Sequence, residues 1–295
     1  MRGNGLDHIL VTVPRDGAPT LTEPSGVSSS HPRLKTLSRL AAAASILRQQ
    51  HGKPGCFRIQ FHDRAPNGAD HTWLCMDAPR EGTAGQQLIP DPYCLDTWGY
   101  QSQQKAFQSL PPWPSRLSMT IWRGSTTGAA KIQLENIHHL LRYRLCHTSL
   151  EFPHRLDARF TNVVQCDDPV QIRHMLQQET LWAPYLRPRH MALHRWIIDI
   201  DGNVNSWGLL WKLLSGSCVL HVNSSRRQWY HDGLIPWKHY IPIAADLSDL
   251  SAMLRWCREY EIDCKTIACA GQAYARRVVD QINMRLERAV LATAH

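Results

Sequence analysis

No apolar run in this sequence approaches the ~20 residues that a helix needs to cross a bilayer. Residues 1–17 contain no apolar segment long enough for a signal peptide. The nine cysteines include no CxxC pair and form no dense, regular framework, which argues against a small disulfide-rich secreted fold. We therefore expect a cytoplasmic protein with reduced thiols, and leave peripheral contact with a membrane open.

Metal-binding motifs of familiar spacing are missing as well. His190 and His194 lie four residues apart, but no Glu follows His190, as the HExxH motif requires. The closest cysteine group, Cys257, Cys264 and Cys269, lacks the spacing of a zinc site. We therefore expect no bound metal ion.

The charge is moderately basic, but it is not concentrated. Lys and Arg number 33 against 25 Asp and Glu, which gives a net charge of +8 and favours anionic partners. However, no run of five or more Lys or Arg occurs, and no zinc-finger, homeodomain or ribonucleoprotein motif is visible. A basic nucleic-acid-binding protein is therefore the weakest hypothesis, because charge alone supports it, and we expect no nucleic-acid partner.

The composition and the periodicity predict the fold class. The 295 residues, 43% of them hydrophobic, are ordinary for a soluble globular protein and sufficient for two domains. Apolar residues at helical spacing predict helices over residues 34–52, 132–145, 168–178, 206–214, 247–260 and 266–292. Strand patterns occur over residues 56–63, 71–79, 116–128, 156–161, 192–203, 216–222 and 237–243. This alternating order predicts an α/β fold with largely parallel sheets.

Two segments suggest how the chain is divided. Residues 14–33 are rich in Pro, Gly and Ser, which is typical of a flexible loop. The stretch "LPPWPSR" (110–116) is a stiff, extended connection between two lobes. We predict a loop-rich, acceptor-side lobe over residues 1–112, a nucleotide-sugar-binding lobe over 113–275, and a C-terminal helix over 276–295 that returns to the first lobe.

A first strand-to-turn junction with suitable chemistry is "IWRGSTTG" (121–128). Gly124 allows a close approach of the backbone to a ligand, and Arg123 offers a forked cation. Ser125 and Thr126 add hydroxyl and amide groups, so the junction suits a diphosphate. The alternative is an ordinary helix start, since Ser and Thr are common N-cap residues.

A second junction is "DGNVNSWG" (201–208), which follows the apolar run "WIIDI". Ser206 is placed to cap the predicted helix after it, and free amides at a helix start face anions. The turn is not a GxGxxG fingerprint, so it does not imply a dinucleotide.

The third junction, "PIAADLS", follows the strand pattern of "WKHYIPI". Here Asp246 either accepts a hydrogen bond from a ribose or sugar hydroxyl or caps the helix that follows. By itself this junction is a weak signal.

Together, "WRGSTTG", "DGNVNSW…LLSGS" and "QWYHDGLIPWKHYIPIAADLSDL" resemble glycosyltransferase family 90 over residues from about 121 to 280. That family includes capsule-associated fungal proteins, bacterial lipopolysaccharide-modifying enzymes and animal protein O-glucosyltransferases. The resemblance implies a GT-B architecture, in which two Rossmann-like domains have a sugar nucleotide in the cleft between them. It also implies inversion at the anomeric centre without a metal, and a UDP-sugar as co-substrate rather than a resident cofactor.

The resemblance also assigns donor-binding residues. The animal members carry an Arg where this chain has Gly208. A second family Arg corresponds to Arg142, Arg144 or Lys131, of which we favour Arg142. The donor-binding set implied is Arg123, Gly124, Ser125, Thr126, Arg142, Asn203, Val204, Asn205, Ser206, Trp207, Ser215 and Asp246.

An inverting transferase needs one base that takes the proton of the acceptor hydroxyl. In the family this base is an Asp directly after a strand of the first lobe, and "FRIQFHDRAP" matches that pattern at Asp63. His62, Asp77 and Asp91 are the alternatives. The aromatic stretch "DPYCLDTWGY" (91–100) either lines the acceptor site or packs in the core.

The leading hypothesis is therefore a sugar transferase with a UDP-hexose or UDP-pentose donor and a hydroxyl acceptor on a glycan, a lipid-linked molecule or a protein, as in lipopolysaccharide or capsule biosynthesis. The alternative is a non-catalytic module of the same fold that binds a nucleotide or glycan. Gly208 and the loop-rich first lobe favour this alternative.

Overall fold

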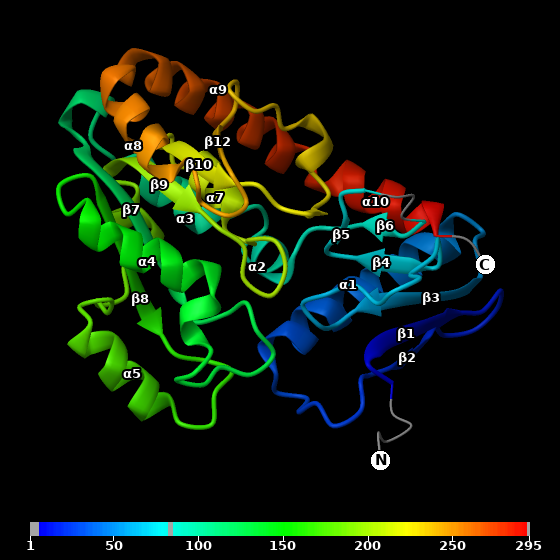
Figure 1. Cartoon of the computed structure of the whole chain (residues 1–295). Helices are drawn as coiled ribbons and strands as arrows, with labels where there is room; N and C mark the ends of the chain where they lie inside the picture. The colour runs from blue at the N-terminus through cyan, green and yellow to red at the C-terminus, as the bar shows by residue number, and fades with distance from the viewer. Residues whose placement is uncertain (1–5, 82–84, 294–295) are drawn as a thin grey trace. The chain divides into compact units, whose positions relative to one another are not determined.

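The computed structural model describes residues 6–81 and 85–293 (Figure 1). The chain forms two compact units. Unit 1 comprises the described residues up to Gly99, the segment Ser225–Asp232 and the described residues from Val278 onward, and unit 2 comprises Tyr100–Ser224 and Gly233–Arg277. Each unit combines a β-sheet with helices, so the predicted α/β class is confirmed. The segment 110–116, which the sequence suggests as a boundary, lies inside unit 2.

Unit 1 has a mixed five-stranded sheet in the order β2-β1-β3-β4-β6. Its strands are β1 (His8–Val13), β2 (Thr20–Thr22), β3 (Gly55–Gln60), β4 (Trp73–Cys75) and β6 (Gln87–Leu88). β1 is antiparallel to both β2 and β3, whereas β3, β4 and β6 are parallel. The prediction that residues 14–33 form only a loop was therefore wrong at Thr20–Thr22. The short strand TLT has a polar outer face, and its pairing with β1 is what fixes it.

The helices of unit 1 are α1 (Pro32–Gln50), α2 (Pro92–Asp96) and α10 (Ile282–Ala292). α1 buries Leu34, Leu37 and Ala41 and packs on β1. α10 packs on α1, where the buried Arg48 donates to the carbonyl oxygens of Val290 at 3.0 Å and Thr293 at 2.8 Å. The predicted return of the C-terminal helix to the first lobe is thus confirmed. A small antiparallel pair, β5 (Ala78–Pro79) with β11 (Arg226–Arg227), joins the segment 225–232 to this unit.

Unit 2 has a fully parallel five-stranded sheet in the order β12-β10-β9-β7-β8. Its strands are β7 (Leu117–Ser125), β8 (Leu156–Asn162), β9 (His194–Asp199), β10 (Cys218–Val222) and β12 (Ile241–Ile243). Every residue of β10 is buried, as expected of a central strand that is covered on both faces.

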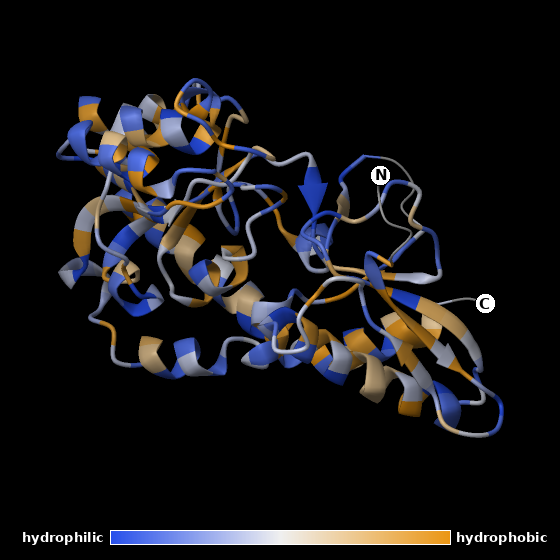
Figure 2. Ribbon diagram, turned by 90° about the horizontal axis from the view of Figure 1, so that it is seen from below, coloured by the Kyte–Doolittle hydropathy of each residue, from blue (hydrophilic) through white to orange (hydrophobic). Residues whose placement is uncertain are grey.

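The helices of unit 2 are α3 (Gln101–Phe107), α4 (Leu141–Glu151), α5 (Pro169–Gln178), α6 (Pro188–Met191), α7 (Leu209–Leu214), α8 (Leu250–Glu259) and α9 (Glu261–Asp280). The last residues of α9, from Val278 onward, belong to unit 1. Hydrophobic and hydrophilic residues are interspersed along the helices (Figure 2).

Three predicted helices have different bounds. The helix predicted over 132–145 starts only at Leu141, because the Asn136 side chain accepts from Gln133 N at 2.9 Å and donates to Lys131 O at 3.1 Å, which favours a turn over a helix. The helix predicted over 206–214 starts at Leu209. The single helix predicted over 266–292 is two helices, α9 and α10, with Gln281 between them.

Candidate functional site

The strand order of unit 2 points to one edge of its sheet. From β7, the chain places β8 on one side and β9, β10 and β12 on the other, so the order reverses between β7 and β9. In open parallel sheets, ligands bind in the crevice beyond the carboxyl ends of the strands at such a switch point. The turns after β7 and β9 therefore form the candidate site, and they are the first two junctions singled out in the sequence.

The two turns contact each other directly. The amide of Gly128, after β7, donates to the Asn203 Oδ1 atom, after β9, at 3.1 Å. A side chain at Gly202 would collide with the Thr127 hydroxyl and crowd the Arg142 guanidinium. Gly202 is therefore needed for the close approach of the two turns. The two turns therefore lie together at one edge of the unit 2 sheet.

Arg142, from α4, fastens the two turns together. Its Nε donates to Asp201 O at 2.8 Å and its Nη2 to Ile200 O at 3.1 Å. Its Nη1 donates to Ser125 O at 3.0 Å and to Thr127 Oγ1 at 2.5 Å. Burial lowers the pKa of Arg142 to about 10, so the side chain is charged at neutral pH. Four of the five N–H groups of the guanidinium thus hold the turns in place.

Asp201 organises the turn after β9 from within. Its Oδ1 accepts from the amide of Ser206 at 3.1 Å, and its Oδ2 accepts from the hydroxyl of Ser224 at 2.5 Å. Burial raises the pKa of Asp201 above its usual range, against the hydrogen bond from Ser224. The Asp201 carboxylate therefore holds the turn through these two hydrogen bonds.

Asn205, on the same turn, has a buried side chain that lacks hydrogen-bond partners among the described residues. The side chain belongs to a residue that is only 3% exposed, and neither its amide nitrogen nor its amide oxygen has a partner in that part of the chain. Buried amides are almost always hydrogen-bonded, and leaving one without a partner costs about 1–3 kcal/mol. The arrangement is what a site for a polar ligand requires.

A buried charge cluster lies beneath the turn after β9. Lys212, on α7, contacts Asp199 Oδ1 at 2.5 Å and the Ser206 hydroxyl at 3.5 Å, and the His221 Nδ1 atom lies 2.9 Å from Asp199 Oδ2. Burial alone would raise the pKa of Asp199, but Lys212 and His221 outweigh it and hold that pKa well below its usual range. No motif in the sequence indicates this cluster. The available signal was a single Lys inside the apolar helix LLWKLL.

Gly208 lies beside the same lysine. A Cβ atom at this position would lie 2.9 Å from the Trp211 Nε1 atom and 3.3 Å from the Lys212 Nζ atom. The space that a side chain at position 208 would enter is therefore already bordered by a tryptophan and an ammonium group.

The "RGS" residues face several ways. The Arg123 guanidinium forms an ion pair with Asp157 at 2.5 Å, near the amino end of β8 and away from the turn. Gly124 lies against the buried Trp122 ring, with which any side chain at 124 would collide. The fully buried Thr126 exchanges hydrogen bonds of 3.0 Å with Val164. The structure thus brings Ser125 to the site by its backbone and does not bring the Arg123 guanidinium there.

Two other predicted donor residues lie outside the paired turns. Ser215 is buried at the end of α7, on the opposite edge of the sheet, and its hydroxyl donates to Lys212 O at 2.5 Å. Asp246 follows β12 on the same edge as the turns, and the amide of Ser248 donates to its Oδ1 at 3.0 Å. Within the turn after β9, Val204 is buried, and the carbonyl of Trp207 accepts a hydrogen bond from the Tyr100 hydroxyl at 2.8 Å.

The candidate bases lie in unit 1 and differ sharply in exposure. Asp77 is fully buried and holds the Ala65 amide at 2.8 Å, together with Gln60 and Arg226. Asp91 is 1% exposed and caps α2. The Asp63 side chain, just after β3, is 37% exposed and forms an ion pair with Arg33 at 2.8 Å.

The surroundings of Asp63 fix its position. The Gln60 side-chain amide donates to the carbonyl oxygens of His62 at 2.8 Å and Asp63 at 2.9 Å. The Arg33 guanidinium donates to Phe61 O at 2.9 Å as well as to the Asp63 carboxylate. His62 is exposed. Of the three Asp candidates, Asp63 is the one whose carboxylate is accessible.

Metal-binding clusters and membrane-spanning helices are both absent from the part of the chain that the structure describes. Within residues 6–81 and 85–293, no group of three or more His, Cys, Asp or Glu side chains could hold a metal ion. None of the helices in this part of the chain is both long enough and apolar enough to cross a membrane.

Comparison with known proteins identifies relatives of the chain. The model of glycosyl transferase family 90 matches residues 94–285. Uncharacterized protein 035R of Invertebrate iridescent virus 3 is 30% identical over 181 residues, which are 59% of this chain and 16% of that protein. Protein O-glucosyltransferase 2 of Danio rerio is 27% identical over 171 residues, which are 56% of this chain and 30% of that protein.

The chain thus matches less than a third of the length of these two curated relatives. Among solved structures, HepE of Anabaena in complex with UDP-glucose matches with a TM-score of 0.41 and 14% identity, over 66% of this chain and 52% of that chain. The matched family segment includes both turns of the candidate site and begins after Asp63.

Proposed function

Because this chain belongs to glycosyl transferase family 90, we propose that it transfers a sugar from a UDP-sugar to a hydroxyl group of an acceptor. The observation that carries the proposal is the unpartnered, buried amide of Asn205 on a turn that Arg142 holds at the switch point of the unit 2 sheet. Such a turn offers a polar ligand fixed hydrogen-bonding groups without reorganisation. The protein O-glucosyltransferase relatives support glucose as the first sugar to test.

We assign the donor to the paired turns of unit 2. In this proposal, backbone groups of Ser125 and of residues 203–206 meet the nucleotide and the diphosphate, and Asn205 supplies both an acceptor and donors. Arg142 acts through the turns that it fastens, since most of its N–H groups are already used. Lys212 lies under the turn after β9 in an ion pair with Asp199. We propose that the fixed dipoles of the turns, together with Arg142, offset the negative charge of the departing diphosphate without a metal.

The reaction assigned to the site is a single displacement. The base, Asp63, takes the proton of the acceptor hydroxyl, and the acceptor oxygen forms a bond to the anomeric carbon of the sugar. The bond from that carbon to the diphosphate oxygen breaks on the opposite side, and UDP leaves with the electron pair. The configuration at the anomeric carbon is therefore inverted. The accessible carboxylate of Asp63 favours it over the buried Asp77 and Asp91.

The test is a UDP-release and transfer assay, with thermal shift measured in UDP-glucose, GDP-mannose and CMP-sialic acid. We expect the UDP compound to stabilise the protein. Asp63→Asn should retain that binding but lose transfer by about 10²–10⁴-fold, the usual contribution of a general base. Asp16→Asn, at an exposed turn of the same unit, is the matched control and should keep full activity. Full activity in Asp63→Asn would remove Asp63 from the mechanism.

A non-catalytic module remains the second candidate because of Gly208. Trp211 and Lys212 border position 208, where the animal family members have an arginine, so the turn of this chain lacks that cation. A module would bind UDP-glucose without releasing UDP, even with sugar acceptors present. Release of UDP above the buffer rate would exclude this candidate.

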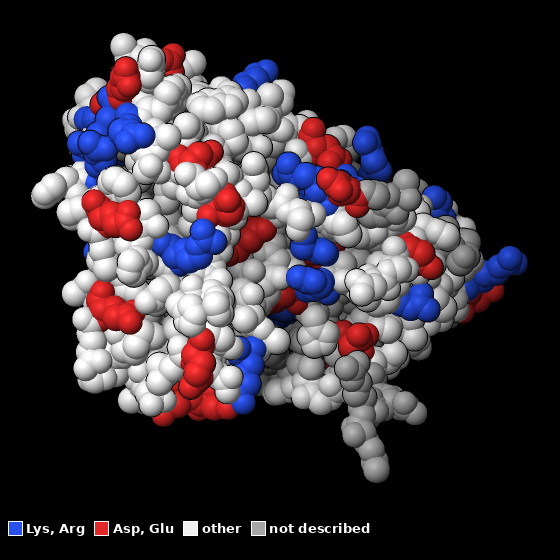
Figure 3. All heavy atoms as spheres, in the orientation of Figure 1, with Lys and Arg blue, Asp and Glu red and all other residues white. Residues whose placement is uncertain are grey.

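The acceptor and the cellular role follow from the same proposal. We propose a glycan, lipid-linked or protein hydroxyl as acceptor, a role in lipopolysaccharide or capsule biosynthesis, and a cytoplasmic location with peripheral membrane contact. Acidic and basic side chains are interspersed on the face shown in Figure 3, which gives no support to a nucleic-acid-binding surface there. An acceptor screen that compares oligosaccharides, glycolipids and folded protein domains would decide among the acceptor classes.

A further inference from the structure

A network of buried side chains holds the Asp63 loop (residues 61–65) of unit 1. Gln60, at the end of β3, is 1% exposed, and its side-chain amide donates to the carbonyl oxygens of His62 at 2.8 Å and Asp63 at 2.9 Å. The same nitrogen donates to Asp77 Oδ1 at 3.0 Å, so its two N–H groups are shared among three acceptors. The Gln60 amide oxygen accepts from the amide of Met76 at 2.8 Å. One side chain thus joins the Asp63 loop to the chain after β4.

Asp77 holds the same loop at a second point and is itself paired with a cation. Its carboxylate is fully buried, and its Oδ1 atom accepts from the amide of Ala65 at 2.8 Å. Its Oδ2 atom forms an ion pair with the Arg226 guanidinium. A buried charge needs such a partner, because removal of either member leaves the other uncompensated. The carboxylate is therefore fixed between the Asp63 loop and Arg226.

Arg226 comes from a distant part of the sequence. It lies on β11, which pairs with β5, and β5 directly follows Asp77. In the sequence, Arg226 comes only two positions after Ser224, whose hydroxyl donates to Asp201 in the turn after β9. The segment that anchors the Asp63 loop is therefore covalently continuous with a residue that holds one of the donor turns.

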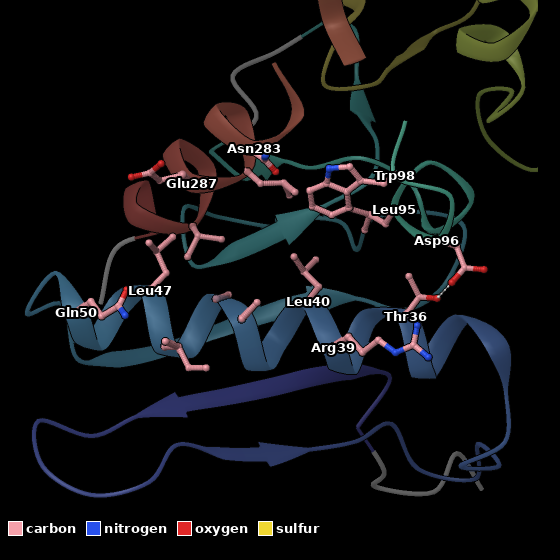
Figure 4. Close-up of a pocket in the computed structure, with 15 residues that line it drawn as sticks. Thr36, Arg39, Leu40, Leu47, Gln50, Leu95, Asp96, Trp98, Asn283 and Glu287 are labelled. Carbon is pink, nitrogen blue, oxygen red and sulfur yellow. Dashed lines mark hydrogen bonds between the residues drawn. The ribbon is translucent and has the colours of Figure 1, made fainter. Parts of the chain in front are cut away.

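The Asp63 carboxylate is held by a further element, α1. Arg33, in the first turn of α1, donates to Asp63 Oδ1 at 2.8 Å and to Phe61 O at 2.9 Å. Three residues further along α1, the Thr36 hydroxyl donates to the Asp96 carboxylate of α2 at 2.8 Å (Figure 4). The start of α1 is thereby fastened to α2. The carboxylate of Asp63 thus has a defined position, although its side chain is 37% exposed.

We propose that Gln60, Asp77 and Arg226 are positioning residues that hold Asp63 where it can take the proton of the acceptor hydroxyl. The inference rests on the proposed function, in which Asp63 is the base. A general base has to lie within hydrogen-bond reach of the proton that it takes. A misplacement of about 1 Å can lower the rate about 10²-fold. Because Gln60 and Asp77 are buried, they act through the Asp63 loop and do not contact the substrate.

The experiment compares two quantities in the full chain: kcat for UDP release from UDP-glucose with water as acceptor, and the Kd for UDP-glucose from calorimetry. Asp77→Asn combined with Arg226→Met removes both charges of the ion pair, so neither is left buried alone. We expect kcat to fall about 10–100-fold while the Kd stays within twofold. Gln60→Met, which removes the donor to the His62 and Asp63 carbonyl oxygens, should have the same effect.

A double-mutant cycle separates positioning from simple stabilisation of unit 1. In the Asp63→Asn background there is no base left to position, so adding Asp77→Asn and Arg226→Met should change the residual kcat by less than twofold. Arg48→Lys is the matched control, because it weakens another buried cation of unit 1, whose hydrogen bonds go to the end of the chain. It should lower the thermal midpoint and leave kcat within twofold when rates are compared well below every midpoint.

The outcomes that contradict the inference differ from those that contradict the proposed function. Unchanged kcat in the folded Asp77→Asn, Arg226→Met and Gln60→Met proteins would overturn the positioning role. So would a rate loss of equal size in the presence and absence of the Asp63 carboxylate. A wild-type chain that releases no UDP above the buffer rate, or an Asp63→Asn variant with full activity, would instead refute the proposed function, and the positioning role with it.

Discussion

Replacing Arg142 by lysine tests whether this side chain holds the donor turns in place. Arg142 makes four hydrogen bonds to the two turns through three nitrogen atoms fixed in one plane. A lysine ammonium has three N–H groups at a single point, so it can keep one or two of these bonds. The loss of two or three, each contributing about 1 kcal/mol, should destabilise unit 2 by about 2–3 kcal/mol. For a unit of this size, that lowers the thermal midpoint by about 4–12 °C.

The same change should weaken donor binding. Without the Arg142 guanidinium, the turns after β7 and β9 separate more easily. The arrangement that binds the donor then becomes a smaller fraction of the population. We expect the Kd for UDP-glucose, measured by calorimetry, to rise at least tenfold.

Arg144→Lys is the matched control, because Arg144 lies on the same helix and is exposed. Its guanidinium donates to Asp246 O at 2.9 Å and not to the two turns among the described residues. Its midpoint should shift by less than 2 °C and its Kd by less than twofold. Equal effects of the two substitutions would refute the idea that Arg142 organises the site. So would an Arg142→Lys variant with unchanged affinity.

Three further predictions concern the same unit and its reaction. Asn205→Leu should raise the thermal midpoint of the ligand-free protein, because it removes a buried amide that lacks hydrogen-bond partners among the described residues. The same change should raise the Kd for UDP-glucose at least tenfold. A lower midpoint with unchanged affinity would contradict the role given to Asn205. Burial lowers the pKa of His194, against its hydrogen bond with Met119 O, so the unfolded state binds a proton more readily. The contribution of neutral His194 to the stability of unit 2 should therefore be complete above about pH 6.5. It should be lost as the pH falls from there through the lower pKa of the folded state. Melting temperatures measured across this pH range should depend less on pH in His194→Asn. Finally, EDTA should leave UDP release unchanged, and recovery of lost activity by Mg²⁺ or Mn²⁺ would contradict metal independence.

The positions of the two turns could be predicted from the sequence because they follow from strand pattern and parallel topology. "WRGSTTG" contains the end of β7 and the turn after it, "DGNVNSW" follows β9, and parallel strands place their carboxyl ends on one edge. The directions in which the side chains point could not be predicted from the sequence pattern. Arg123 belongs to the motif, yet its guanidinium runs back along the sheet to Asp157, a residue that only the pairing of β7 with β8 brings near.

Other features depend on contacts that no local pattern reports. Lys212 is the sole charge in an apolar helix, and its role emerges only once Asp199 and His221 are placed on neighbouring strands. The short strand Thr20–Thr22 has little apolar character, and its partner β1 determines its conformation. Asp63 could be chosen by resemblance, but its accessibility relative to Asp77 and Asp91 required the fold of unit 1.

The composition of unit 1 from three separate segments has a consequence for biosynthesis. Arg48 of α1 is fully buried against carbonyl oxygens of Val290 and Thr293, so the first long helix lacks these acceptors until the residues near position 290 have been translated. Unit 2 ends at Arg277 and can complete its sheet earlier on the ribosome. Within these residues, α1 is thus synthesised before unit 2 but gains its last contacts after it, so unit 1 completes its fold last.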